Sequence, residues 1–279
     1  MTYVWIGLII LFAVLIHEVG HLIAMRKCGV WVDELGVGLP WGPRIGWTFP
    51  SKKYPGKSFA VSLYPLLLLG AFVKPENEGK GMKELSYHDQ AFIYGAGIIG
   101  NFVMIALGIA LIGALLPEGR SVLMPLMPFW KVTVASASLW WGLLSTVVVL
   151  LFARPITQYL FPVMAVVIMY WITTMILGMP FETFVKESGG IVAIAQLGEK
   201  FSKSLVALTY FGVLVSYLLA LTNLLPIYPL DGGQTMQLLG EKYAPRIWGV
   251  LKKVGITFFL ILVVFALAGD IRRLIDLFY

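Results

Sequence analysis

Long apolar stretches separated by shorter polar segments run through most of this chain of 279 residues. An α-helix needs about 20 apolar residues to cross the hydrocarbon core of a bilayer. We expect the last of the apolar windows to be tilted or thinly buried, because it is short. The pattern predicts a mainly α-helical membrane protein with six spans, at residues 4–25, 90–116, 133–152, 157–179, 204–225 and 254–268.

The composition agrees with this prediction. Apolar residues make up 59% of the chain and charged residues only 13%, which is typical of integral membrane proteins. Residues 1–3 carry no basic side chain, and no small-residue cleavage site follows the first apolar stretch. We therefore expect this stretch to remain in the membrane rather than to be removed as a signal peptide.

Residues 31–75 do not follow the helical pattern. Residues 58–64 alternate with period two, and Gly and Pro at 41–43 and 54–56 indicate turns. We expect three or four short strands here, forming a small sheet between the first two spans. Residues 63–73 are too apolar for a hairpin that lies wholly in water, so the sheet is expected to be associated with the membrane. A purely structural pair of hairpins is the alternative.

Basic residues predict an orientation for the chain. If the six spans alternate sides, 14 Lys and Arg residues lie on one side of the membrane and 7 on the other. The positive-inside rule then places both termini outside the cytoplasm. We attribute the net charge of +6 to this topology and to attraction for the anionic lipid bilayer. No basic and aromatic surface pattern indicates a nucleic-acid partner.

The strongest chemical signal lies inside the first apolar stretch, at His17-Glu18-Val19-Gly20-His21. Positions i and i+4 share a helix face, so both imidazoles can reach one metal ion. A Glu beside such a pair is the general base of zinc hydrolases. The pattern also occurs by chance in soluble helices. Three ionisable side chains in hydrocarbon are costly, however, and this favours a functional zinc (Zn²⁺) site with Glu18 as the catalytic base.

A second signal follows the fifth span, in Asn-Leu-Leu-Pro-Ile-Tyr-Pro-Leu-Asp-Gly-Gly at residues 223–233. Pro226 and Pro229 interrupt the helix and free backbone groups. Asp231 is the best candidate for a third metal ligand, since two His and one carboxylate leave a position open for water. Asp231 could instead cap a following helix. Its predicted position on the same side as the His pair favours the ligand.

Together the two motifs resemble the signatures of the site-2 protease family of intramembrane zinc metalloproteases, peptidase family M50. Residues 95–102 resemble the family's A-G-P-x-x-N-F stretch, although Ile98 replaces the proline. The likeness covers about residues 4–116 and 188–274, and it is closest to bacterial members that cleave membrane-bound anti-sigma factors. Those members carry PDZ domains between their second and third core helices. Here residues 117–187 hold two apolar windows in place of a PDZ domain.

The resemblance implies a division of the chain and a set of roles. Residues 1–116 and 188–279 would form the protease core, and residues 117–187 would add two helices. His17, His21 and Asp231 would bind zinc, and Glu18 would act as general base. Asn223 would position the substrate and steady the oxyanion.

The resemblance also implies a substrate and a location. The substrate would be a single-pass membrane protein, such as an anti-sigma factor or another membrane-tethered regulator, in the bacterial cytoplasmic membrane. Its unwound segment is expected to pair with an open strand edge within residues 58–73, at Val61 and Leu63. This edge is expected to lie near Asn223, Pro226 and Pro229.

Two alternatives are not proteases. A catalytically inactive relative could bind transmembrane helices, but the presence of all four catalytic positions argues against it. A transporter could hold a metal at broken helices. The two halves of the chain do not resemble each other, however, so the internal repeat expected of many transporters is missing.

Overall fold

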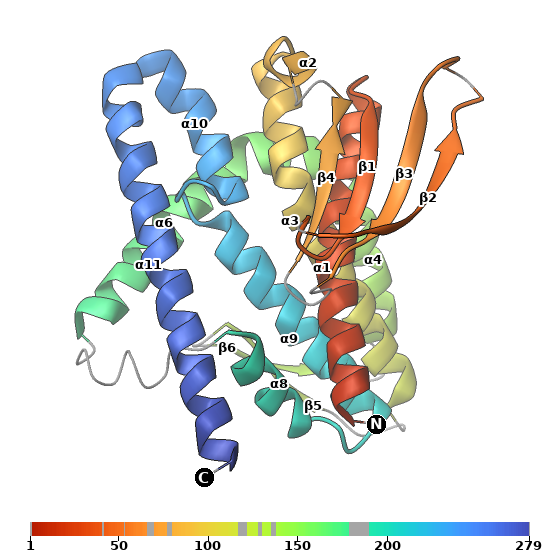
Figure 1. Ribbon diagram of the computed structural model, residues 1–279. Helices are drawn as coiled ribbons and strands as arrows, with labels where there is room; N and C mark the ends of the chain where they lie inside the picture. Colours follow the sequence, from red (N-terminus) through yellow and green to blue (C-terminus); the bar gives the residue numbers. More distant parts are fainter. Residues whose placement is uncertain are drawn as a thin grey trace.

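The structure is a computed structural model that describes residues 2–40, 42–52, 54–65, 70–76, 80–116, 122–127, 130–134, 138–178 and 190–278. Helices form most of it, and a small β-sheet lies beside the first helix (Figure 1). The predicted class, a mainly α-helical membrane protein with a small sheet between the first two long helices, is confirmed.

Three long helices pack against one another at the centre of the molecule. Ile6, Ile93 and Phe211 within them are at most 1% exposed. Two of the helices touch at the level of the backbone, because a Cβ atom at Gly20 would lie 2.2 Å from the carbonyl oxygen of Ala96. This close contact sets one face of the first helix directly against the second. The three helices are α1 (Thr2–Lys27), α3 (Tyr87–Leu115) and α9 (Leu205–Leu224).

The number of spans differs from the six expected. Four helices in the described part of the chain are long and apolar enough to cross a membrane, and one bent pair of helices could count as a fifth span. The prediction of six spans is therefore not confirmed, although the membrane class is. The four helical segments are Tyr3–Lys27, Tyr87–Leu115, Leu205–Leu224 and Pro245–Asp276, and the bent pair is Leu139–Leu151 with Ala153–Tyr170.

The third predicted window begins in a strand rather than in a helix. Strand β6 (Trp130–Val134) pairs with β5 (Val122–Met127), and its β-branched residues favour a strand. Helix α4 (Ser138–Leu151) is therefore only 14 residues long. The chain bends by 71° after α4, close to Pro155, as expected where proline interrupts helical hydrogen bonds. Helix α5 (Ala153–Pro155) follows the bend. The fourth window then corresponds to η3 (Ile156–Leu160) and α6 (Phe161–Gly178), and its last residue, 179, lies outside the described residues.

The last window is longer than expected. Helix α11 (Pro245–Phe278) has 34 residues, because the helix continues beyond its apolar centre into charged residues at both ends. It follows α10 (Asp231–Tyr243), and both ends of the chain lie at the same end of the molecule (Figure 1). Two shorter helices are α2 (Lys80–Lys83) and α8 (Ile191–Glu199).

The region between α1 and α3 forms a mixed four-stranded sheet, as the alternating pattern predicted. The strand order is β2-β3-β1-β4, with β1 parallel to β3 and the other pairs antiparallel. Gly42 and Gly56 have positive φ at the two predicted turns, which explains the glycines there. The strands are β1 (Val32–Val37), β2 (Ile45–Pro50), β3 (Ser58–Leu63) and β4 (Ala71–Pro75).

Strand β3 lies in the interior of this sheet. Val61 is paired with Leu35 on one side and with Trp47 on the other, and Leu63 is paired on both sides in the same way. The prediction that Val61 and Leu63 form an open edge is therefore wrong. The alternating sequence predicted the strand correctly, but it does not contain the strand order. In the described sheet the open edges belong to β2 and β4.

Candidate metal centre

Three ligand side chains meet where α1 approaches α10. His17 and His21 lie one turn apart on α1 and are 4% and 9% exposed, and Asp231 at the start of α10 is 7% exposed. Asp231 Oδ2 lies 3.0 Å from His17 Nε2 and 3.2 Å from His21 Nε2. The two Nε2 atoms are 3.3 Å apart. Within the part of the chain that the structure describes, these residues form the one group of three that could hold a metal ion.

The partners of the two imidazoles determine which nitrogen carries the proton. Asn101 donates its amide to the Ala13 carbonyl at 3.3 Å, so its oxygen faces His17 Nδ1 at 2.7 Å. His21 Nδ1 faces the carbonyl oxygen of Ile93, also at 2.7 Å. Both oxygens accept hydrogen bonds and cannot donate them, so each Nδ1 atom must carry a hydrogen. Both Nε2 atoms are therefore bare and point toward Asp231.

This arrangement fits a zinc ion. Two bare imidazole nitrogens and a carboxylate oxygen converge without a proton between them, and Asp231 Oδ2 is buried without a hydrogen-bond partner. Three lone pairs this close repel one another unless a cation lies between them. Ligands at zinc distances in a tetrahedron are about 3.3 Å apart, which matches the three observed separations. His17, His21 and Asp231 are therefore the residues that would hold the ion.

Gly97 on α3 leaves the space in which the ligand atoms meet. A Cβ atom at this position would lie 2.4 Å from His21 Nε2 and 2.5 Å from His17 Nε2. The neighbouring contact of Gly20 with Ala96 shows that α1 and α3 are close here at the level of the backbone. A side chain at residue 97 would therefore fill the space beside the two Nε2 atoms.

The alternative role for Asp231, as a helix cap, does not agree with its contacts. No side-chain hydrogen bond caps the start of α10 in the described structure, and the carboxylate faces the two histidines instead. The glycines that follow allow α10 to begin against the end of α9. A Cβ atom at Gly232 would lie 2.3 Å from the Leu224 carbonyl oxygen. The broken segment thus carries Asp231 to the histidines.

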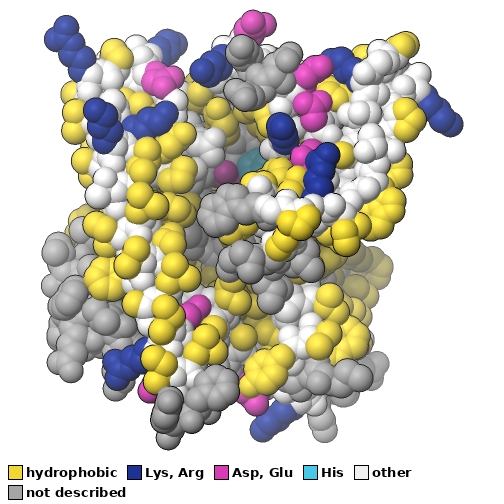
Figure 2. Space-filling model, in the orientation of Figure 1, with side chains coloured by type: hydrophobic (Ala, Val, Ile, Leu, Met, Phe, Trp, Pro, Cys, Tyr) yellow, Lys and Arg dark blue, Asp and Glu magenta, His cyan; other side chains and the backbone are white. Residues whose placement is uncertain are grey.

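Glu18 lies beside the ligands in a cavity of about 370 Å³ that is also lined by His21 and Asp231. Strand β4 contributes Ala71, Phe72 and Val73 to the same cavity. The backbone N–H of Val73 faces the Glu18 carboxylate. Figure 2 shows a hollow between α11 and the sheet, with histidine and acidic side chains at its floor. Glu18 therefore faces both the candidate ligands and an open strand edge.

Three residues after the fifth span were predicted to bind substrate, and the structure connects them less directly with Glu18 than the residues described above. The Asn223 amide donates to the Leu219 carbonyl of its own helix at 3.1 Å. Pro226 is half-buried and Pro229 is exposed, in the segment that joins α9 to α10. None of the three lines the cavity beside Glu18. Their contact with substrate stays a prediction.

The sequence did not identify several residues that shape this centre. Asn101 is the clearest of them, since it is a fully buried amide in a very apolar helix, and that isolation was a usable signal. The Ile93 carbonyl and the Val73 N–H are backbone groups, so the residue type at these positions does not predict their role. Gly97 stood in a recognised motif, but its role depends on a contact between two helices.

A polar cluster on the sheet lies apart from the metal ligands. Glu34 in β1 is 6% exposed and accepts hydrogen bonds from Arg44 at 2.8 Å and from Tyr64 at 2.9 Å. Burial alone would raise the pKa of Glu34. The hydroxyl groups of Ser62 and Tyr64 and the Arg44 guanidinium outweigh it and lower this pKa below its usual value. The cluster ties β1 to the adjoining ends of β2 and β3.

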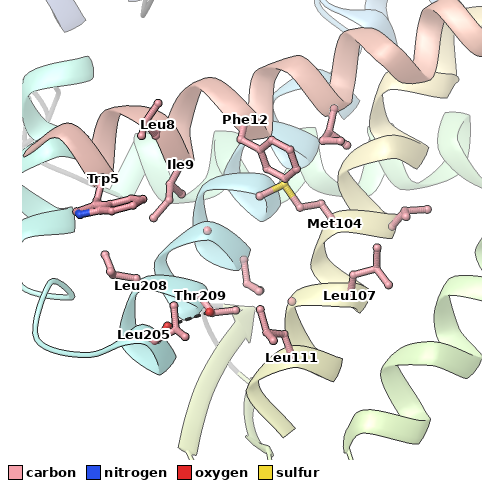
Figure 3. A pocket seen from close by; sticks show the side chains of 15 residues that line it. Trp5, Leu8, Ile9, Phe12, Met104, Leu107, Leu111, Leu205, Leu208 and Thr209 are labelled. Carbon is pink, nitrogen blue, oxygen red and sulfur yellow. Dashed lines mark hydrogen bonds between the residues drawn. The ribbon is translucent and has the colours of Figure 1, made fainter. Parts of the chain in front are cut away.

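A further cavity, of about 600 Å³, lies between α1, α3 and α9 (Figure 3). Its walls are apolar side chains, among them Trp5, Phe12 and Met104. Its hydroxyl group belongs to Thr209, which donates to the Leu205 carbonyl of its own helix at 2.8 Å. The lining residues include no ionisable side chain, so this cavity is not a site of hydrolysis.

Comparison with known proteins agrees with the metal centre. The sequence matches peptidase family M50 over residues 5–267. A candidate zinc metalloprotease of Pasteurella multocida and the Regulator of sigma E protease of Haemophilus influenzae are each 32% identical over 117 residues. Each of these alignments covers 37% of this chain and 25% of the relative. The chain therefore spans about a quarter of the length of these curated relatives.

Proposed function

The chain belongs to peptidase family M50, the site-2 protease family, and from this premise we propose that it is a zinc metalloprotease that cleaves the membrane-spanning segments of other proteins. One observation carries the proposal. Two bare imidazole nitrogens and one carboxylate oxygen converge among apolar helices, with a second carboxylate, that of Glu18, in the same cavity. A buried group of this kind is costly unless it has a function.

The residues of the chain divide the chemistry among them. A zinc ion held by His17, His21 and Asp231 would supply a Lewis acid. Glu18 accepts the proton of the attacking water and passes it to the nitrogen of the cleaved peptide bond. The Val73 N–H faces the Glu18 carboxylate across the cavity. Asn101 and the Ile93 carbonyl hold the two imidazoles in their metal-binding tautomer.

The substrate must be extended at the point of cleavage, because a helix hides its carbonyl groups in internal hydrogen bonds. The open edge of β4 offers backbone partners to an extended segment, since Ala71 and Val73 line the same cavity as Glu18. Strand addition is therefore assigned to β4 and not to β3. Asn223, Pro226 and Pro229 would contact the segment from the α9–α10 side.

The substrate class and location are carried over as part of the proposal. The substrate is a single-pass membrane protein, such as an anti-sigma factor or another membrane-tethered regulator. The name of the Haemophilus influenzae relative, Regulator of sigma E protease, supports this class. The protein would lie in a bacterial cytoplasmic membrane, with its termini outside and its metal centre in the cytoplasmic half. An inactive helix-binding protein would not need Glu18 beside three intact ligands.

Replacement of the base tests the proposal. Glu18→Gln should lower the rate of cleavage about 10²–10⁴-fold, while the purified protein keeps its zinc. Membranes from cells that carry this variant should accumulate a full-length single-pass protein, identified by quantitative proteomics. The matched control is Glu84→Gln, which changes an exposed carboxylate outside the cavity. A fully active Glu18→Gln protein would exclude the mechanism.

The zinc ligands are tested separately from the base. His17→Ala with His21→Ala should remove bound zinc, as measured by metal analysis of the purified protein. Full zinc content in that double variant would show that the metal lies elsewhere.

A further inference from the structure

Helix α11 contacts α10 near its first end and α8 near its second end. Near the first end, Trp248 and Gly255 are buried, and Trp248 lies against Gly240 of α10. Near the second end Asp270 is buried. None of the residues of α11 between Gly255 and Asp270 is buried, and this stretch is about 22 Å long. The middle of α11 is therefore less buried than its two ends, and its side chains are mainly apolar.

Asp270 makes the second of these contacts. Its carboxylate accepts hydrogen bonds from the backbone N–H groups of Gly190, Val192 and Ala193 at 2.9, 3.1 and 3.2 Å. These groups begin α8, where the helix dipole also favours a negative charge. A carboxylate in an apolar helix is costly without such partners. Asp270 thus fastens α11 to α8.

Helix α8 is itself fixed to the centre of the molecule. Ile194 and Ala195 pack against the cluster of α1 and α9 that contains Ile6 and Phe211. At the other end of α8, Tyr3 donates a hydrogen bond to Glu199 at 2.7 Å. The Asp270 carboxylate therefore connects the far half of α11, through α8, to α1, which carries His17 and His21.

A cleft of about 1250 Å³ lies between this half of α11 and the sheet. Its walls are the ends of β2 and β3, the start of α8, and one face of α11 that includes Val263, Leu267 and Asp270. A helix 10 Å wide occupies about 120 Å³ per residue, so the cleft can hold about ten helical residues. Apart from Arg44 and Asp270, which are engaged by Glu34 and by α8, its walls are mainly apolar. These walls and the place of the cleft beside a membrane-spanning helix suit a transmembrane segment and not a soluble peptide.

The cleft is continuous with the end of the sheet that borders the metal centre. Leu63 lines the cleft and Ala71 lines the cavity beside Glu18, and both are paired with Val37 of β1. The two sites therefore meet at one end of the sheet. A chain could remain helical in the cleft and become extended along β4 toward the ligands.

We propose that the cleft between α11 and the sheet holds the still-helical part of a membrane-spanning substrate, and that Asp270 keeps α11 in position as its outer wall by capping α8. This inference rests on the proposed proteolysis and names where its substrate is held. Asp270 acts through α11 and is a positioning residue.

Disulfide trapping tests the occupant without requiring cleavage. The protein carries Glu18→Gln and Cys28→Ser, and the probe is a reporter with one transmembrane segment and one cysteine in its non-cytoplasmic half. Leu267→Cys, which lines the cleft, should trap the reporter several-fold more than Val264→Cys. Both side chains are exposed, at 52% and 64%. Equal trapping at the two positions, or trapping of only a second copy of the protein at Leu267→Cys, would overturn the proposal.

The contact between Asp270 and α8 is tested by removing it and replacing it with a disulfide bond. Asp270→Ala should lower cleavage of the membrane reporter about tenfold, with zinc retained and with little change for a reporter already loosened by Gly and Pro. A Cβ atom at Gly190 would lie 3.7 Å from the Ala266 Cβ atom, which is a disulfide distance. Gly190→Cys with Ala266→Cys in the Asp270→Ala protein should therefore restore cleavage when oxidised and lose it again on reduction.

The same protein in its reduced form is the matched control. A disulfide that forms without restoring cleavage, or an Asp270→Ala protein that cleaves both reporters normally, would overturn the role of Asp270. If Asp270→Ala does not fold, Asp270→Asn keeps the shape and one acceptor and should give an intermediate loss. Absence of cleavage of either reporter by the unchanged protein would instead contradict the proposed function, and the trapping result would still stand.

Discussion

Asn101 and His17, 84 residues apart in the chain, are joined by a buried hydrogen bond of 2.7 Å between Oδ1 and Nδ1. The bond leaves the other nitrogen of His17 bare toward Asp231, and it connects α1 to α3 at the metal centre. It assigns the Asn of the A-G-P-x-x-N-F-like stretch a physical role, which is to fix a ligand in the tautomer that binds metal.

Removal of this acceptor should weaken zinc binding. Asn101→Leu is expected to lower zinc affinity about 10–100-fold, the range for partners of metal-bound histidines. Asn101→Asp keeps an oxygen toward His17 and should retain more zinc than Asn101→Leu. Competition with a chelator measures the affinity. The control is Ser216→Ala, which removes another fully buried polar group from the central helices. Unchanged affinity in Asn101→Leu would mean that the imidazole orients itself.

Gly97→Ala should strongly reduce the zinc content of the protein and should reduce its thermal stability much less. The new methyl group would lie within 2.5 Å of both Nε2 atoms, and the imidazoles are held by Asn101 and Ile93 and cannot easily move aside. Metal analysis and a thermal unfolding scan separate the two effects. Gly249→Ala on α11, where a Cβ atom meets nothing within 4 Å, is the control and should be neutral or slightly stabilising. Normal zinc content in Gly97→Ala would contradict the geometry.

The Glu34 cluster should give the sheet a pH-dependent stability. The pKa of Glu34 is lower in the folded protein than in the unfolded chain. Its contribution is therefore fully present above the unfolded pKa, about 4.3, and is lost as the pH falls through the folded pKa. The effect should be small, because the Arg44 side chain is 53% exposed.

Hydrogen exchange of the β1 and β3 amides, corrected for intrinsic rates, measures this dependence from pH 7 to pH 3. Glu34→Gln should weaken protection at pH 7, and its difference from the unchanged protein should shrink at pH 3. Glu84→Gln is the control for loss of an exposed carboxylate. An equal effect of Glu34→Gln at both pH values would assign the cluster to packing and not to charge.

The parts of the site that the sequence predicted are those set by local periodicity. His17 and His21 share a face because they are one helical turn apart, and this needed no knowledge of the fold. The four strands followed from alternation and from glycines at turns. The role of Asp231 was harder to predict, because its position depends on a break between two helices. The two prolines and two glycines around it nevertheless indicated that break.

The parts that failed are those set by contacts between distant segments. Val61 and Leu63 alternate in the same way in an interior strand as they would at an edge, and only the parallel pairing of β3 with β1 decides between the two. The number of spans failed for a related reason. The third window is uncharged and mainly apolar, but pairing of β6 with β5 takes its first residues out of the helix. The composition of a window contains no information about such strand pairing.

The open edge of β4 leads to the last prediction. The Gly38 N–H donates to the Gly70 carbonyl at 2.8 Å. Bonded and non-bonded pairs of β1 and β4 alternate from this point, so the Val73 N–H points away from β1. Alternate residues of a strand present their backbone groups in the same direction, so the Ala71 N–H also points outward toward the cavity. Ala71→Pro removes this donor without removing a bond to β1 or the contact with Glu18, and proline is tolerated at the first residue of a strand.

Ala71→Pro should therefore lower cleavage of a helical membrane reporter while zinc content stays normal. One lost backbone hydrogen bond corresponds to about a fivefold decrease. The decrease should be smaller for a reporter loosened by Gly and Pro, because less pairing is needed to hold an already extended segment. Ala71→Val is the matched control, since it changes the side chain and keeps the N–H. Equal loss in Ala71→Val would assign the effect to side-chain bulk, and no loss in Ala71→Pro would mean that the helices alone hold the substrate.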